Sequence, residues 1–155
     1  MRPIPLLCCL LLVRIACAQQ VPDTLFKAPI AEPMYAKDQG PVVLLDEAHH
    51  NFHTLAGRYR AFGHALRDDG YVVRPNTEQF TEMALAQARV LVVANALSER
   101  NAQTWTLPCP SAFSEKEIAA VKAWVEQGGS LFLIADHMPF AGAAQELGAA
   151  FGFTW

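Results

Sequence analysis

The chain has 155 residues, of which 52% are hydrophobic and 17% are charged. This composition excludes a disordered segment and fits one compact domain. Twelve basic and fifteen acidic residues give a net charge of −3, so we do not expect the chain to bind nucleic acid.

The first 18 residues have the features of a secretory signal peptide. An early arginine precedes an apolar run over residues 4–13, and small residues before and at Ala18 form a cleavage site. The run is shorter than the roughly 20 residues that cross a membrane. We therefore expect cleavage after Ala18, export to the periplasm or the extracellular space, and a mature chain without a membrane span.

Residues 19–40 hold three prolines and no apolar period, which predicts an extended N-terminal arm. From residue 41 to residue 155, apolar runs typical of strands alternate with amphipathic segments typical of helices. The predicted strands cover residues 41–47, 71–73, 89–95 and 130–135. The predicted helices cover residues 52–66, 77–88, 114–127 and 142–150, and a long loop covers residues 96–113.

Three local signals set the ends of these elements. Gly70 is placed to stop the first helix, and Pro75 is placed to close the second strand. Ser114 and Glu117 have the spacing of a capping box at the start of the third helix.

The alternation predicts an α/β fold with a doubly wound, mainly parallel sheet. We expect the flavodoxin-like strand order 2-1-3-4. Residues 151–155 have the pattern of a strand that is only beginning. The domain over residues 41–155 is therefore expected to be incomplete at its C-terminus.

Acidic and histidine residues gather directly after the first and fourth predicted strands. Because ligands bind outside the carboxyl ends of the strands in open parallel sheets, both segments are expected to face one crevice. The predicted ligand-binding residues are Asp46, Glu47, His50, His53, Asp136 and His137.

Three interpretations of this group stay open. His49, His53, Asp136 and His137 offer the nitrogen and oxygen ligands that suit zinc or another divalent metal, and His49 and His53 would share one helical face. Acid/base catalysis would use a carboxylate to orient an imidazole, although neither segment contains a serine or cysteine nucleophile. In a structural interpretation, the aspartates accept hydrogen bonds from loop amides and the histidines pack.

A family resemblance is carried by the segments VVLLDEAHHNFHTLAGRYRAF, DGYVV, RVLVVAN, SEKEIAAVKAWVEQGGSLFLIADHMPF and LGAAFGF. Over residues 41–155 the chain resembles an uncharacterised domain family of the class I glutamine-amidotransferase-like superfamily. The resemblance implies a flavodoxin-like sheet with a cysteine nucleophile in a Gly-x-Cys-x-Gly turn after the fourth strand. Here that turn, residues 135–139, has no cysteine, so amidotransferase activity is not expected. The related trehalose-utilisation-like proteins, which are associated with sugars, have a histidine at this turn, as His137 is here.

The sequence therefore predicts an exported domain without amidotransferase activity that binds a small polar ligand, such as a sugar or a cell-wall fragment, at the loops after strands 1 and 4. A metal-dependent hydrolase that uses the same residues is one alternative. A non-catalytic scaffold or partner-binding domain is another. The pattern predicts neither the oligomeric state nor whether the protein is an enzyme.

Overall fold

Four parallel strands form the single sheet in the computed structural model, which describes residues 21–154. The strands are β1 (Val42–Asp46), β2 (Val72–Asn76), β3 (Val90–Ala94) and β4 (Ser130–Ile134). They lie in the order β2-β1-β3-β4, and every neighbouring pair is parallel. The predicted α/β fold and its flavodoxin-like strand order are confirmed. The predicted signal peptide lies outside the described residues.

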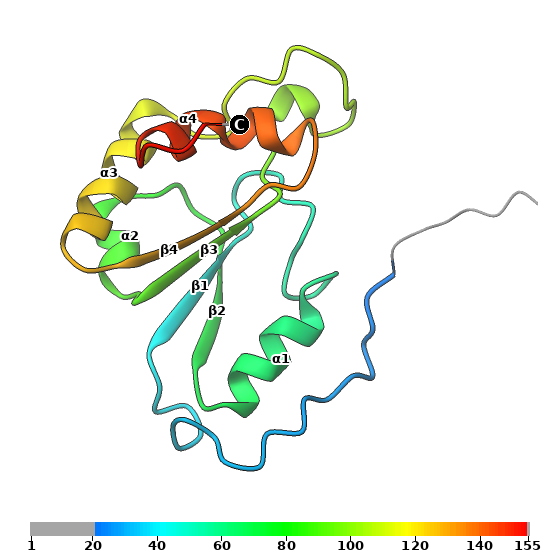
Figure 1. Ribbon diagram of the computed structural model, residues 1–155, viewed down its shortest axis with the longest axis vertical. Coiled ribbons are helices and arrows are strands. Elements are labelled where there is room, and N and C mark those ends of the chain that lie inside the picture. The colour runs from blue at the N-terminus through cyan, green and yellow to red at the C-terminus, as the bar shows by residue number, and fades with distance from the viewer. Residues whose placement is uncertain (1–20, 155) are drawn as a thin grey trace, which may run out of the picture.

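Helices cover both faces of the sheet (Figure 1). They are α1 (Arg60–Asp68), α2 (Glu82–Ala86), α3 (Glu115–Glu126) and α4 (Phe140–Ala149), with a short 3-10 helix at Glu99–Asn101. Figure 1 shows α1 on one side of the sheet and α2, α3 and α4 on the other. Between residues 21 and 154, no helix has the length and apolar character needed to cross a membrane.

Each face of the sheet has its own hydrophobic core, because successive strand residues point to opposite faces. The core under α2, α3 and α4 includes Leu44, Leu91, Val93, Leu85, Val121 and Leu147. The core under α1 includes Val43, Leu45, Val73 and Val92, with Phe62 and Leu66 packed against them. The uninterrupted apolar runs of β1 and β3 therefore reflect strands that are covered on both sides.

The first helix begins at Arg60, not at Phe52 as predicted. Residues 47–59 instead form a loop, and the amide of Phe52 donates to the carbonyl of Asn95 at 3.0 Å. Leu55 and Tyr59 have helical spacing, but they pack on the core from this loop. The prediction that His49 and His53 share a helical face is therefore wrong.

Pro75 does not close the second strand, which continues to Asn76. Because β2 is an edge strand, a proline that lacks an amide proton is tolerated there.

The predicted strand at the C-terminus is absent from the described residues, since residues 151 and 152 form a turn. The amides of Phe151 and Phe153 donate to the carbonyl of Gly148 at 3.0 and 3.1 Å. These two bonds fold the segment back onto the end of α4.

The described part of the N-terminal arm contains neither helix nor strand, and it is attached to the C-terminal end of α1. The amide of Tyr35 donates to the carbonyl of Asp69 at 3.2 Å, and the amide of Gly40 donates to that of Gly70 at 2.9 Å. Gly70 has φ of +91°, and a Cβ atom there would lie 2.2 Å from the carbonyl oxygen of Tyr35. Glycine is therefore required where the arm meets the helix.

Candidate functional site

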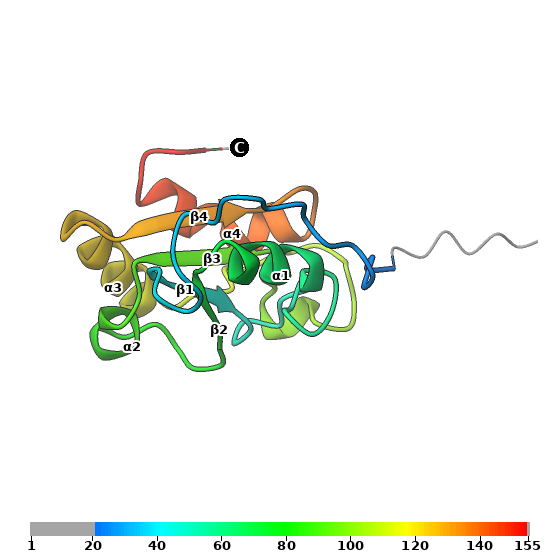
Figure 2. The same ribbon diagram turned by 90° about the horizontal axis from the view of Figure 1, so that it is seen from below.

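The loops that follow β1, β3 and β4 gather at one end of the molecule, at the right of Figure 2. This arrangement follows from the parallel sheet, in which all strands have their carboxyl ends on the same edge. The opposite end holds the turns that lead into the strands. The predicted site residues belong to the loops after β1 and β4.

Asn95, the residue after β3, joins these two loops. Its side-chain nitrogen lies 3.2 Å from Nε2 of His53, and its side-chain oxygen accepts the amide of Asp136 at 3.4 Å. The side chain is buried, and the backbone has φ of +49°, a conformation that asparagine adopts more readily than most residues. Asn95 thereby places His53 and Asp136 on either side of one amide group.

His53 is held between aromatic rings. It stacks on Tyr59 with a centroid distance of 4.5 Å and meets the edge of Phe52 at 5.4 Å. Burial lowers the pKa of His53, the charge of Asp136 opposes this, and the charge of Arg58 adds to it. His53 is therefore neutral at pH 7. Because the Asn95 amide donates to Nε2, the ring proton of the neutral form is on Nδ1.

Asp136 and His137 are exposed to the solvent beside this ring. Nδ1 of His137 lies 2.8 Å from Oδ1 of Asp136, and the two side chains are 59% and 53% exposed. Although partial burial acts to raise the pKa of Asp136, the hydrogen bond with Asn95 and the charge of His137 lower it below its usual value. The site therefore carries an ionised carboxylate.

An exposed tryptophan completes the surface. Trp105, from the long loop after β3, is 47% exposed. Its ring contacts Phe140 at a centroid distance of 5.0 Å, Phe52 at 5.4 Å and His137 at 5.9 Å. We use the name loop cluster for His53, Asn95, Trp105, Asp136 and His137. Trp105 and Asn95 were not among the predicted site residues, because their only signal in the sequence is their position after the third strand.

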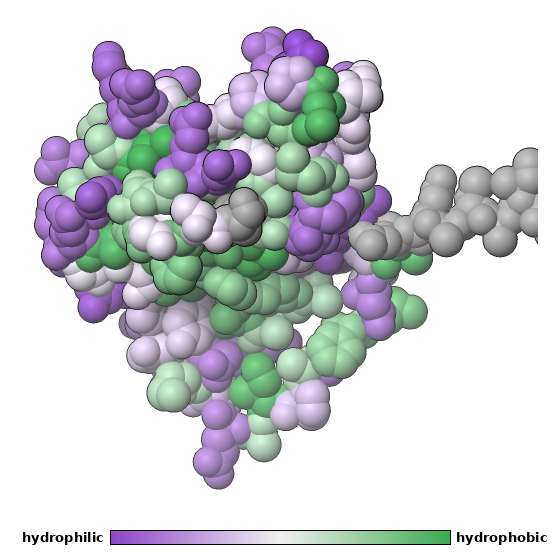
Figure 3. Space-filling view, turned by 45° about the horizontal axis from the view of Figure 1, so that its top comes forward, coloured by the Kyte–Doolittle hydropathy of each residue, from purple (hydrophilic) through white to green (hydrophobic). Residues whose placement is uncertain are grey.

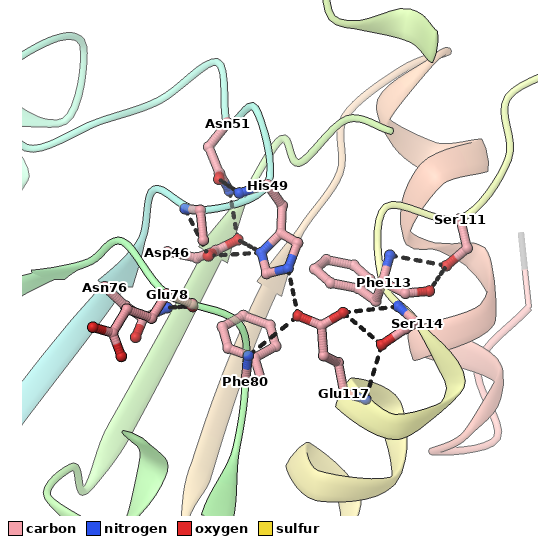
Figure 4. A network of polar contacts seen from close by, with 11 residues as sticks. Asp46, His49, Asn51, Asn76, Glu78, Phe80, Ser111, Phe113, Ser114 and Glu117 are labelled. Carbon is pink, nitrogen blue, oxygen red and sulfur yellow. Dashed lines mark hydrogen bonds and ion pairs between the residues drawn. The ribbon is translucent and has the colours of Figure 1, made fainter. Parts of the chain in front are cut away.

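Two predicted residues, Asp46 and His49, lie in a separate buried network (Figure 4). Nδ1 of His49 lies 2.9 Å from both carboxylate oxygens of Asp46, and Nε2 lies 2.9 Å from Oε1 of Glu117. The His49 ring packs between the rings of Phe80 and Phe113, at 4.7 and 4.8 Å. Both nitrogens of this imidazole are therefore occupied inside the protein.

The remaining bonds of the network come from neighbouring polar groups. Asn51 donates to Oδ2 of Asp46 at 2.8 Å, and the hydroxyl of Ser114 donates to Oε2 of Glu117 at 2.7 Å. The amide of Phe80 donates to Oε1 of Glu117 at 3.2 Å. We call Asp46, His49, Asn51, Ser114 and Glu117 the buried network. It connects the loop after β1 with the start of α3.

Electrostatics in the buried network favour the charged forms. Burial acts to lower the pKa of His49, but the hydrogen bond and charge of Asp46, followed by those of Glu117, raise it overall. Burial acts to raise the pKa of Glu117, but hydrogen bonds from Ser114 and the contact with His49 lower it overall. Both ring nitrogens of His49 face carboxylate oxygens, an arrangement that favours the protonated imidazole.

The other two predicted residues lie apart from the loop cluster. Oε1 of Glu47 accepts the amide of Leu55 at 2.7 Å, which fixes the loop before α1. His50 is exposed, has φ of +47°, and makes no hydrogen bond or ring contact within residues 21–154. Of the six predicted ligand-binding residues, the structure brings together His53, Asp136 and His137.

The predicted zinc ligands are also divided. His53, Asp136 and His137 surround Asn95, whereas both nitrogens of His49 face carboxylates in the buried network. In the part of the chain that is described, no group of three or more His, Cys, Asp or Glu side chains has a geometry that would hold a metal ion. The loop cluster offers a neutral imidazole, an ionised carboxylate and an indole face, which suit binding of a polar molecule with an apolar side.

Comparisons with protein-family models, with curated proteins and with solved structures find no match to this chain. The functional interpretation therefore depends on the site itself.

Proposed function

We propose that this protein is a binding domain for a small polar ligand of the sugar type, and that the loop cluster is its site. The observation that carries the proposal is the pair of bonds from Asn95 to His53 and to the amide of Asp136, which joins the loops after β1 and β4 into one surface. Such a surface at the carboxyl end of a parallel sheet is where this class of fold binds ligands.

The chemistry of the loop cluster supports a sugar. A sugar ring has apolar C–H faces and a rim of hydroxyl groups. Trp105 offers a half-exposed ring for such a face, while Asp136 and His137 offer an acceptor and a donor at its edge. The site therefore has both kinds of group within one surface.

Membership of the amidotransferase-like superfamily and export from the cell are part of the same proposal. The strand order agrees with the order that the family resemblance implies, and the turn after β4 carries His137 and no cysteine. A thiolate is needed to attack an amide in that chemistry. We therefore propose a binding function rather than amide hydrolysis.

The proposal is tested by titrating neutral, amino and acidic hexoses into the protein and measuring heat. For each sugar that binds, we expect Trp105→Ala, Asp136→Asn and His137→Ala to raise the dissociation constant at least tenfold. Asp68→Asn is the matched control, because Asp68 is exposed at the far end of α1. Wild-type affinity in both Asp136→Asn and His137→Ala would show that the site is wrong, and binding of no hexose would show that the ligand class is wrong.

A further inference from the structure

Two buried side-chain nitrogens, one in the loop cluster and one in the same loop after β1, have no hydrogen-bond partner among the described residues. They are Nδ1 of His53 and Nε of Arg58, and within residues 21–154 they are the only buried side-chain nitrogen or oxygen atoms in this condition. Buried polar groups are normally paired, because an unpaired one costs free energy. Both side chains contact the ring of Phe52, His53 at a centroid distance of 5.4 Å and Arg58 at 3.9 Å, so one bound group could serve both nitrogens.

Both atoms are hydrogen-bond donors. Arg58 is always charged and offers only N–H groups. His53 carries its proton on Nδ1, because its other nitrogen accepts from Asn95. A partner for both must therefore be an acceptor, and next to a guanidinium the favoured acceptor is an anion.

Within residues 21–154, no carboxylate forms an ion pair with Arg58, and the ion pairs present involve His49 and His137. The guanidinium carbon instead lies 3.9 Å from the centre of the Phe52 ring. Stacking uses the flat face of the group and leaves its N–H edge for a ligand.

We propose that Arg58 and His53 bind a carboxylate group of the ligand. This inference rests on the proposed function and narrows it to an acidic sugar, such as a uronic acid, whose ring lies on Trp105. A singly charged carboxylate is favoured over a phosphate, because the ionised Asp136 next to His53 repels a second negative charge. The hydroxyl groups of the sugar then bond to Asp136 and His137.

Binding requires a small movement of Arg58. The two unpaired nitrogens have almost no solvent-exposed surface, while Arg58 as a whole is half-buried. Rotation of the arginine side chain on the face of Phe52 exposes its N–H edge to the ligand. Formation of the two missing hydrogen bonds favours this rearrangement.

The experiment compares three probes that share one ring: D-glucose, D-glucuronate and D-glucose 6-phosphate. Each is titrated into the full chain labelled with ¹⁵N, and the dissociation constants are taken from amide chemical shifts. We expect glucuronate to bind at least tenfold more tightly than glucose, and more tightly than glucose 6-phosphate. We also expect glucuronate, but not glucose, to shift the ring nitrogen signals of His53.

Substitutions of Arg58 test whether its guanidinium group causes the preference for glucuronate. Arg58→Gln should remove the preference for glucuronate and leave the affinity for glucose unchanged. Arg58→Lys keeps a charge without the planar fork and should retain part of the preference. The control is Arg60→Gln, two residues away and exposed, which should behave as the wild type.

The outcomes distinguish the two proposals. Equal binding of glucose and glucuronate that still depends on Trp105 overturns the carboxylate inference and leaves the proposed function in place. Tighter binding of glucose 6-phosphate overturns the choice of carboxylate. A preference for glucuronate that persists in Arg58→Gln also overturns the inference, and failure of all three probes to bind overturns both proposals.

Discussion

His49 illustrates how one residue can have the chemistry of an active site and a structural role. Its side chain is only 7% exposed, and each ring nitrogen faces a carboxylate. Removal of one member of a buried ion pair leaves an uncompensated charge, which typically costs about 3–5 kcal/mol. The side chain of His49 therefore holds the loop after β1 against α3.

We expect His49→Asn to lower the free energy of unfolding by about 3 kcal/mol or more, because Asp46 and Glu117 would lose their shared partner. Urea unfolding followed by circular dichroism measures the change. The same substitution at the exposed His50 is the control and should change stability by less than about 0.5 kcal/mol, since asparagine tolerates the positive φ there. Equal losses in the two variants would contradict the role assigned to His49.

The raised pKa of His49 makes the free energy of unfolding depend on pH. The pKa of His49 is raised above its ordinary value of 6.5, so its contribution is full below pH 6.5 and is lost as the pH rises through the folded-state pKa. The pKa of Glu117 is lowered from 4.5, so its contribution is full above pH 4.5 and is lost as the pH falls through the folded-state pKa. Together these groups stabilise the fold most between pH 4.5 and 6.5.

The measurement is the difference in unfolding free energy between wild type and His49→Asn at pH 5.5, 7.0 and 8.5. We expect this difference to be largest at pH 5.5 and to shrink towards pH 8.5. His53, whose lowered pKa acts in the opposite sense, is present in both proteins and cancels in the difference. A difference that stays constant with pH would show that His49 is not protonated in the folded state.

Several residues of the buried network could be singled out from the sequence, but the contacts between them could not. The spacing of Ser114 and Glu117 predicted a capping box, and the structure confirms it. The second role of Glu117, at 2.9 Å from His49, joins residues 68 positions apart and depends on how α3 docks on the sheet. No local pattern encodes that distance, which is why the predicted site combined buried and exposed histidines.

At the scale of elements, hydrogen bonds from other segments determine where a helix begins when the apolar pattern alone would allow an earlier start. The residues over 52–59 have a helical period, but the bonds from Phe52 to Asn95 and from Leu55 to Glu47 hold this segment as a loop. The sheet was predictable because β1, β3 and β4 are nearly continuous apolar runs. The start of α1 was not, because the competing bonds come from Glu47 and Asn95, which follow β1 and β3 and lie outside the helical pattern.

The capping box gives a prediction for α3. Oγ of Ser114 accepts the amide of Glu117 at 3.3 Å and donates to its carboxylate at 2.7 Å. We expect Ser114→Ala to cost about 1–2 kcal/mol, because both the cap and a bond of the buried network are lost. Ser130→Ala, at an exposed position on β4, should cost less than about 0.5 kcal/mol in the same urea titration. A Ser114→Ala protein as stable as wild type would show that the cap is dispensable.

At the scale of the whole molecule, apolar surface is unevenly covered. Figure 3 shows green, hydrophobic surface gathered across the middle of one face. On the α1 side of the sheet, Val92 is buried, whereas its neighbour Phe132 on β4 is 52% exposed. The helix α1 therefore covers the middle of the sheet better than its β4 edge.

The position of β4 at the edge of the sheet predicts a pattern of amide hydrogen exchange. Among the strands of residues 21–154, β1 and β3 have a partner on each side, whereas β4 pairs only with β3. We expect all amides in the middle of β1 and β3 to exchange slowly. In β4, alternate amides should exchange quickly, because every second one faces away from β3. Uniformly slow exchange along β4, measured by NMR in deuterium oxide, would contradict an open edge.

Asn95 has a consequence for motion as well as for position. Its backbone amide and carbonyl bond to Ile134 and Phe52, while its side chain reaches His53 and the amide of Asp136. One residue thus ties together fluctuations of two segments that are about 80 positions apart in the chain. We expect a ligand that binds the loop after β1 to restrict the loop after β4 as well, because both are bonded to Asn95. A second contact, made with the other loop, would then cost less conformational entropy than the first.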